Sequence, residues 1–114
     1  MKKPISVTVD SSGNPSCDPD LYDVGKSNGV VVIKWKMEND NTSKLYEVTN
    51  VQIQDDTTGE FSDSGKDVGD GWKITDKNDN TQSYQYIITV GLKSTGQQTS
   101  HDPTIRNGGR NASV

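Results

Sequence analysis

The sequence predicts an all-β fold, a single-domain antiparallel Greek-key β-sandwich of about seven strands, for three reasons. Eleven Val, seven Ile and eleven Thr outnumber one Ala, three Leu and three Glu, so strand formers far exceed helix formers. Several short runs alternate apolar with polar residues, as half-buried strands do. Thirteen Asp and eleven Gly gather mostly between these runs, where side-chain hydrogen bonds and positive φ favour turns. Strands separated by turns at roughly 8–12-residue spacing are typical of a sandwich.

The segment Val30–Met37 gives the clearest strand signal. One face carries Val31, Ile33, Trp35 and Met37, and the other carries Val30, Val32, Lys34 and Lys36. β-Branched residues and an indole suit a pleated, half-buried surface. Because only 28% of the residues are hydrophobic, the core must be one thin layer, and we expect Trp35 near its middle.

The other strands follow in order along the chain. The second clear strand is Tyr84–Leu92, with Tyr84, Tyr86, Ile88 and Val90 on one face. Prolines at positions 15 and 19 restrict any strand around Cys17 to a short edge strand. The polar stretch Ser62–Gly71 predicts a surface loop. The domain is expected to span residues 1–107, with a flexible tail at 108–114. Shorter strands are expected at Ile5–Val9, Leu21–Val24, Leu45–Val48, Val51–Gln54 after a possible bulge at Asn50, Trp72–Ile74, and around Ile105.

Charge and length limit the function classes. The 114 residues suffice for one domain, and the net charge of −4 argues against binding nucleic acid or an anionic membrane surface. The start of the sequence, MKKPISVTVD, has no apolar signal-peptide region, and no apolar run reaches membrane-spanning length. The single cysteine cannot form an internal disulfide, so a cytoplasmic location is the simplest expectation, with a disulfide-free secreted protein as the alternative.

Four motifs of the chain occur together: a Trp-bearing strand (IKWKM), a later Trp, a Tyr-rich strand (SYQYIITV) and the closing Asp102-Pro103-Thr104-Ile105-Arg106-Asn107. In these motifs the chain resembles small bacterial β-sandwich proteins of immunoglobulin-like or cupredoxin-like type and uncharacterised function. The resemblance implies the fold rather than an activity. Two departures matter: the lone Cys17 cannot form the immunoglobulin disulfide, and the lone His101 cannot complete a blue-copper site.

Few arrangements in the sequence could support catalysis. It has no G-x-S-x-G or P-loop motif, and a nucleophilic pair would have to combine Cys17 with His101. A small buried thiol and a solvated imidazole are the simpler interpretation. The neighbouring carboxylates Asp55-Asp56, Asp67/Asp70 and Asp76/Asp79 could serve a hydrolase, but Asp is frequent in turns for structural reasons. We therefore expect no enzymatic activity.

Calcium is the ion that the Asp-rich loops would suit best. Residues 76–80 read D-x-N-x-N, the opening of an EF-hand loop, but Thr81 and Ile87 stand where that loop needs Gly and Glu. An EF-hand is therefore excluded. A looser site at one tip of the sandwich would use Asp67, Asp70, Asp76 and Asn78, and the alternative is that these segments are ordinary polar hairpins.

Aromatic residues supply the other candidate site. Trp72 is expected first of all to anchor the core, but an exposed Trp72 with Phe61 would form a stacking surface for a sugar or a protein. The favoured function is a small soluble, non-catalytic binding module without a cofactor. Its partner would be an unidentified protein or a second copy joined through an edge strand. The alternative is a carbohydrate-binding module with calcium bound in its loops.

Overall fold

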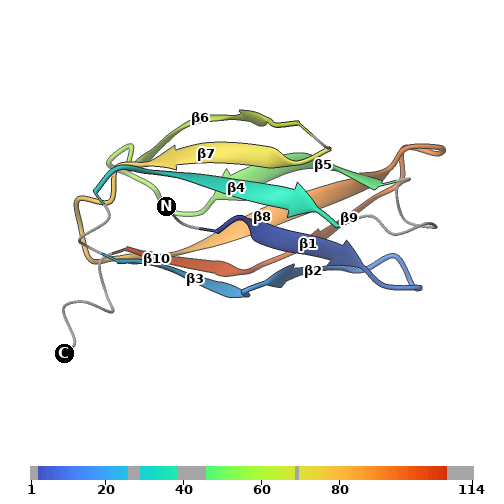
Figure 1. Cartoon of the computed structure of the whole chain (residues 1–114), viewed down its shortest axis with the longest axis horizontal. Coiled ribbons are helices and arrows are strands. Elements are labelled where there is room, and N and C mark those ends of the chain that lie inside the picture. Colours follow the sequence, from blue (N-terminus) through green and yellow to red (C-terminus); the bar gives the residue numbers. More distant parts are fainter. Residues whose placement is uncertain (1–2, 26–28, 39–45, 69, 108–114) are drawn as a thin grey trace.

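The computed structural model describes residues 3–25, 29–38, 46–68 and 70–107, and in these residues the fold is all-β. Two sheets face each other and form a sandwich, which confirms the predicted fold class (Figure 1). Leu45, the expected start of one strand, and the tail 108–114 lie outside the described residues. The described strands are β1 (Ile5–Val9), β2 (Pro15–Asp18), β3 (Leu21–Val24), β4 (Val31–Met37), β5 (Tyr46–Ile53), β6 (Phe61–Lys66), β7 (Trp72–Asp76), β8 (Ser83–Leu92), β9 (Gln98–His101) and β10 (Thr104–Asn107).

The first sheet has the order β2-β1-β4-β7-β6, and the second has the order β3-β10-β8-β5, with β9 also paired to β8. Both sheets are mixed, because β1 pairs with β4 and β3 pairs with β10 in parallel. The expectation of a purely antiparallel sandwich is therefore wrong for these two pairs. Both β9 and β10 run antiparallel to β8, and Asp102-Pro103 separates them. Because proline has no N–H to donate, a ladder is readily interrupted there.

The described residues contain ten strands, more than the seven expected, because short polar strands such as β6 and β9 carry no apolar alternation. The stretch predicted as a surface loop includes most of β6, whose residues Ser62–Ser64 are exposed. This edge strand shifts register between Ser62 and Gly65, so it shows no apolar alternation. Strand β9, with the sequence QTSH, is likewise identified only by its backbone pairing with β8. The bulge expected at Asn50 is confirmed as a register shift in β5.

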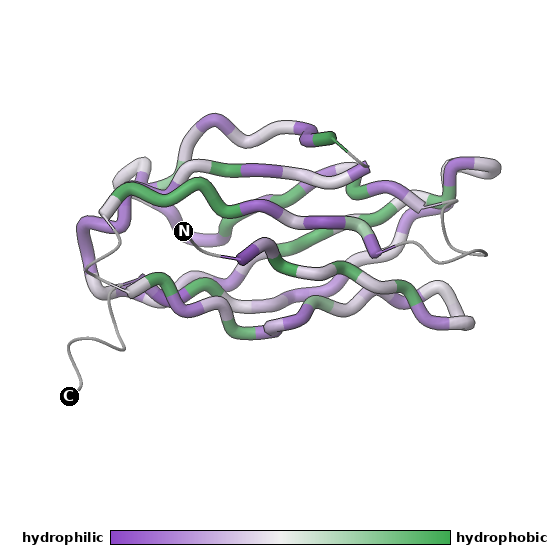
Figure 2. Tube along the Cα trace, viewed as in Figure 1, coloured by the Kyte–Doolittle hydropathy of each residue, from purple (hydrophilic) through white to green (hydrophobic). Residues whose placement is uncertain are grey.

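The core lies between the two sheets and is centred on Trp35, which is 1% exposed. Its indole Nε1 donates a 3.0 Å hydrogen bond to the Tyr86 hydroxyl, and the two rings meet edge to face at 5.3 Å. The predicted inward residues of β4 and β8 are all buried, which confirms both alternation patterns. Figure 2 shows hydrophobic segments along the strands and hydrophilic colouring in the loops at the two ends.

Strand β7 approaches β4 very closely at Gly71, just before Trp72. A Cβ atom at this position would lie 2.2 Å from the Trp35 carbonyl oxygen, so no side chain fits without a shift of the backbone. The glycine therefore lets β7 cross beside the central strand and places Trp72 opposite Trp35. Among the described residues, no helix is long and apolar enough to span a bilayer.

Candidate cation site and basic face

A cluster of buried polar residues lies at one end of the sandwich, at the left in Figure 1. Four of its members, Glu60, Asp76, Asn78 and Asn107, are at most 5% exposed. We call these four residues together with Asn80 the loop-end cluster. Buried polar groups are normally fully hydrogen-bonded, so a group of this kind needs an account of its partners.

Two carboxylates of the cluster are positioned by neighbouring turns. Glu60 comes directly before β6, and the Asp56 carboxylate accepts hydrogen bonds from the N–H groups of Glu60 (2.8 Å) and Phe61 (3.0 Å). Asp76 is the last residue of β7 and is fully buried. The Glu60 side chain in turn accepts a 2.9 Å bond from the N–H of Asp79, so the loops after β5 and β7 are tied together.

Asn107, at the end of β10, connects the cluster across the two sheets. Its Nδ2 lies at hydrogen-bond distance from three oxygens, Glu60 Oε2 (3.1 Å), Asp76 Oδ1 (3.1 Å) and Asn80 Oδ1 (3.2 Å). Asp76 belongs to the first sheet and Asn107 to the second. The cluster therefore joins the two layers with polar contacts at a point where the apolar core ends.

Asn78 adds the loop between β3 and β4 to the same network. Its φ of 54° lies in the left-handed region, which asparagine tolerates better than most residues. Its backbone N–H donates to Asp76 Oδ1 (2.9 Å), and its Nδ2 donates to the carbonyl oxygens of Gly25 (2.9 Å) and Gly29 (3.0 Å).

Three oxygens in this network have no hydrogen-bond partner: Asp76 Oδ2, Asn78 Oδ1 and Asn107 Oδ1. Burial raises the pKa of both Glu60 and Asp76, and the nearby Asp79 carboxylate adds to both shifts. Asp56 also raises the pKa of Asp76. In the described part of the chain, no Lys, Arg or His lies within 4 Å of these carboxylates. The cluster thus contains two buried carboxyl groups without a described basic partner, together with three oxygens that lack a donor.

The metal site predicted from sequence is divided between two places. Asp76 and Asn78 belong to the loop-end cluster, but Asp67 and Asp70 lie in the β6–β7 hairpin at the other end of β7. Asp76 is the last residue of β7, so the span of the strand, about 13 Å from Trp72 to Asp76, lies between it and the hairpin, which is too far for one ion. Asp70 instead forms a 2.8 Å ion pair with Lys93.

The predicted stacking surface of Trp72 and Phe61 does not form. Trp72 is buried and donates its Nε1 hydrogen to Ser64 Oγ at 2.8 Å, so it serves the core as first expected. Phe61 lies at the opposite end of the β6–β7 pair, where its half-buried ring meets Tyr84 edge to face at 5.0 Å.

In the part of the chain that the structure describes, no hydrogen bond joins Cys17 and His101. Burial raises the pKa of the Cys17 thiol to about 11, whereas a nucleophilic cysteine must be readily ionised. His101 Nε2 shares a 2.6 Å hydrogen bond with Asp20 Oδ1 at the surface. The thiol is a small packing group of the core.

The outer face of the first sheet carries a group of lysines. Lys34 of β4 stands directly opposite Lys73 of β7, and Lys36 follows on the same face of β4. We call these three residues the basic face. None of them lies within 4 Å of a carboxylate among the described residues. Beside them is an open groove of about 370 Å³, lined by Pro4, Lys34, Lys36, Asp67 and Val68 among others.

No protein-family model matches the chain, and no curated protein matches it. The cluster residues Glu60 and Asn107 were not found by sequence reasoning, because only the fold brings them to Asp76. The available signals were the position of Asn107 at the end of the closing motif and of Glu60 beside the Asp-rich turn.

Proposed function

We propose that the chain is a non-catalytic, immunoglobulin-like interaction module that binds an acidic protein segment on the basic face. The observation that carries this proposal is the direct cross-strand pair of Lys34 and Lys73. Like charges directly opposite each other destabilise a sheet, and no described carboxylate lies within 4 Å of either lysine. A partner that supplies carboxylates would relieve this repulsion.

The surroundings of the basic face suit a partner that also makes apolar contacts. Val32, which is 49% exposed, lies on the same face, and Val30 just before β4 is 68% exposed. Val68 beside the groove is 88% exposed. In a chain of net charge −4, an acidic segment would be steered to this local positive area rather than to the remaining surface.

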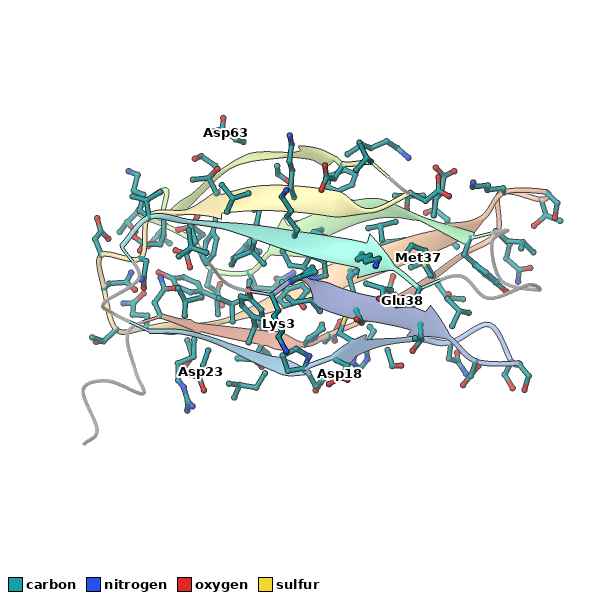
Figure 3. All side chains as sticks on the ribbon, viewed as in Figure 1. Lys3, Asp18, Asp23, Met37, Glu38 and Asp63 are labelled. Carbon is teal, nitrogen blue, oxygen red and sulfur yellow. The ribbon has the colours of Figure 1, made fainter. Side chains whose placement is uncertain are left out.

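The edges of the first sheet are less suited to self-association. The β6 edge carries a register shift and Asp63 with a φ of 55°, and Figure 3 shows Asp63 pointing away from the molecule. The other edge, β2, begins at Pro15. Bulges, charges and proline are the features that block edge-to-edge pairing. These features favour the face over the edges as the binding surface.

Other partner classes have less support. Three lysines make too small a basic area for nucleic acid, which requires several phosphate contacts. A carbohydrate-binding module would need an exposed aromatic surface, and Trp72 is buried while Phe61 packs on Tyr84. The raised pKa of Cys17 and the surface bond of His101 to Asp20 supply no support for nucleophilic catalysis.

Binding of fluorescent poly-L-glutamate at low salt tests this proposal. The wild-type chain should bind, and the double variant Lys34→Gln/Lys73→Gln should lose about tenfold in affinity, because each exposed lysine–carboxylate contact contributes up to about 1 kcal/mol at low salt. Lys93→Gln is the matched control, since Lys93 already pairs with Asp70. Equal binding by the double variant would contradict the proposal. Binding of a sulfated polysaccharide but not of polyglutamate would assign the face to an acidic carbohydrate instead.

A further inference from the structure

We propose that the loop-end cluster binds a divalent cation, and that Ca²⁺ is the ion it fits best. The proposal is carried by the three buried oxygens without partners, Asp76 Oδ2, Asn78 Oδ1 and Asn107 Oδ1. Asp76 and Asn107 are fully buried and Asn78 is 5% exposed, so bulk solvent does not reach these atoms. The site uses none of the residues of the basic face, so the two proposals can be tested separately.

The cluster contains more acceptors than donors. The Asn107 amide faces three oxygens, and each of them also accepts one backbone N–H. No donor of the network is left for Asp76 Oδ2, Asn78 Oδ1 and Asn107 Oδ1. A single cation supplies a positive partner to several oxygens at once, which the available hydrogens cannot do.

The charge of the cluster points to the same ligand. Glu60 and Asp76 are both bonded to Asn107, and Asp56 and Asp79 lie close enough to interact with Asp76 electrostatically. No described Lys, Arg or His pairs with any of these acids. A buried charge normally requires a counter-charge, and a divalent cation would supply it.

The types of donor atom distinguish between ions. Among the described residues, no three His, Cys, Asp or Glu side chains form a metal-binding group, so this site depends on asparagine oxygens as well as carboxylates. Zn²⁺ prefers nitrogen and sulfur ligands, and Mg²⁺ requires a strict octahedron. Ca²⁺ accepts carboxylate, amide and backbone oxygens in irregular geometry and is therefore the best match.

The ion would bind the three oxygens that have no partner, Asp76 Oδ2, Asn78 Oδ1 and Asn107 Oδ1. These ligands come from the end of β7, the β7–β8 loop and the end of β10. The ion would then hold the two sheets together, because β7 and β10 belong to different sheets.

Thermal unfolding of the full chain in EDTA and in about 5 mM Ca²⁺ tests the proposal, since protein sites bind Ca²⁺ with Kd values up to the millimolar range. The wild-type Tm should rise by about 5 °C or more in Ca²⁺ and less in Mg²⁺. Asp76→Asn keeps the shape of the side chain but removes one charge and one carboxylate oxygen, and it should lose the response. Asp70→Asn removes the same charge at the other end of β7 and should retain it.

The outcomes separate the alternatives. A folded wild type whose Tm does not change in Ca²⁺ would overturn the proposal, and stabilisation by acid alone would show that protons balance the cluster. A Ca²⁺ response that survives in Asp76→Asn but disappears in Asp70→Asn would also overturn it, because the ion would then bind at the hairpin. If Asp76→Asn fails to fold, Glu60→Gln replaces it, and calorimetric titration should show at least about tenfold weaker Ca²⁺ binding.

Discussion

The two ends of β7 are both rich in Asp and turn residues, yet they differ in physical character. At the hairpin end, Asp70 is half-buried and forms an ion pair with Lys93 near the surface. At the loop end, Asp76 is fully buried and has one oxygen without a partner. The same residue types therefore form an ordinary turn at one end of β7. At the other end they form a buried polar network in which some oxygens have no hydrogen-bond partner. What differs is the set of elements that meet there, including Asn107 from the second sheet.

The two ends also differ in which part of the chain is sensitive to substitution, the backbone at one end and the side chains at the other. At the hairpin end, the part that tolerates no change is Gly71, because β7 passes the Trp35 carbonyl there. At the loop end, the side chains themselves carry the contacts that connect the sheets. Substitutions at the two ends should therefore act through different mechanisms.

The largest effect is expected from Gly71→Ala at the hairpin end. Its Cβ would lie 2.2 Å from the Trp35 carbonyl oxygen, so the two central strands of the first sheet must separate. We expect a loss of about 3 kcal/mol in the free energy of unfolding, measured by urea denaturation. Gly65→Ala is the control, because a Cβ there meets nothing within 4 Å. Equal losses in the two variants would show that the close approach is not what matters.

The next largest effect is expected from Asn107→Ala at the loop end. The change removes a buried side chain and the donor shared by Glu60, Asp76 and Asn80, so each of these oxygens keeps only one backbone N–H. In EDTA, the free energy of unfolding should fall by about 2 kcal/mol. Asp70→Asn should lower it by less than about 1 kcal/mol, since it removes only a surface ion pair and Asn tolerates the left-handed φ of 65° at this position. If the hairpin variant were the more damaging of the two, the comparison between the ends would be wrong.

The strands that form the core could be predicted from sequence because the alternation of apolar and polar residues along them shows which side chains face inward. This holds for Trp35 on β4 and for Tyr86 on β8. Strands β6 and β9 show no such alternation, because their stability comes from backbone pairing with β7 and β8.

The candidate site could be predicted only in part. Asp76 and Asn78 are close in sequence, and their D-x-N-x-N pattern made them visible. Glu60 and Asn107 are 47 residues apart and meet only in the folded chain. Asp67 and Asp70 were predicted as ligands together with Asp76. The sequence alone does not show that they lie at the opposite end of β7. The basic face was visible as Lys34 and Lys36, but the register that places Lys73 opposite Lys34 is a tertiary property.

The pH dependence of the free energy of unfolding should distinguish the loop end of β7 from the hairpin end. Glu60 and Asp76 have raised pKa values in the folded chain, caused first by burial and then by nearby acids that include Asp79 and, for Asp76, Asp56. The folded state thus binds protons more tightly than the unfolded state, so stability in EDTA should fall as pH rises from about 4 toward neutrality through this window.

Replacing Asp76 removes part of this dependence. Asp76→Asn should fall less steeply with pH than the wild type, as measured by urea denaturation at a series of pH values. The matched control is Asp70→Asn, which changes the net charge equally at the other end. Identical pH profiles for Asp76→Asn and the wild type would show that the buried carboxylate does not carry the effect.

The smallest effect is expected between the two ends, on the exposed face of β7. Lys73→Glu replaces the repulsive pair with Lys34 by an attractive one and should raise the free energy of unfolding by about 0.5 kcal/mol. The same variant should bind polyglutamate more weakly, so stability and binding should change in opposite directions. A variant that is both less stable and equally competent in binding would remove the basis for the basic face.

The central claim is that the loop-end cluster binds Ca²⁺. Its most direct test is a Ca²⁺ titration of the isotope-labelled full chain, followed by nuclear magnetic resonance of its amide groups. The side-chain amide signals of Asn78, Asn80 and Asn107 should shift with saturation, while the backbone amides of Asp67 and Asp70 should stay in place. A spectrum that does not change up to about 10 mM Ca²⁺, above the range of weak protein sites, would contradict the account. So would shifts confined to the hairpin end.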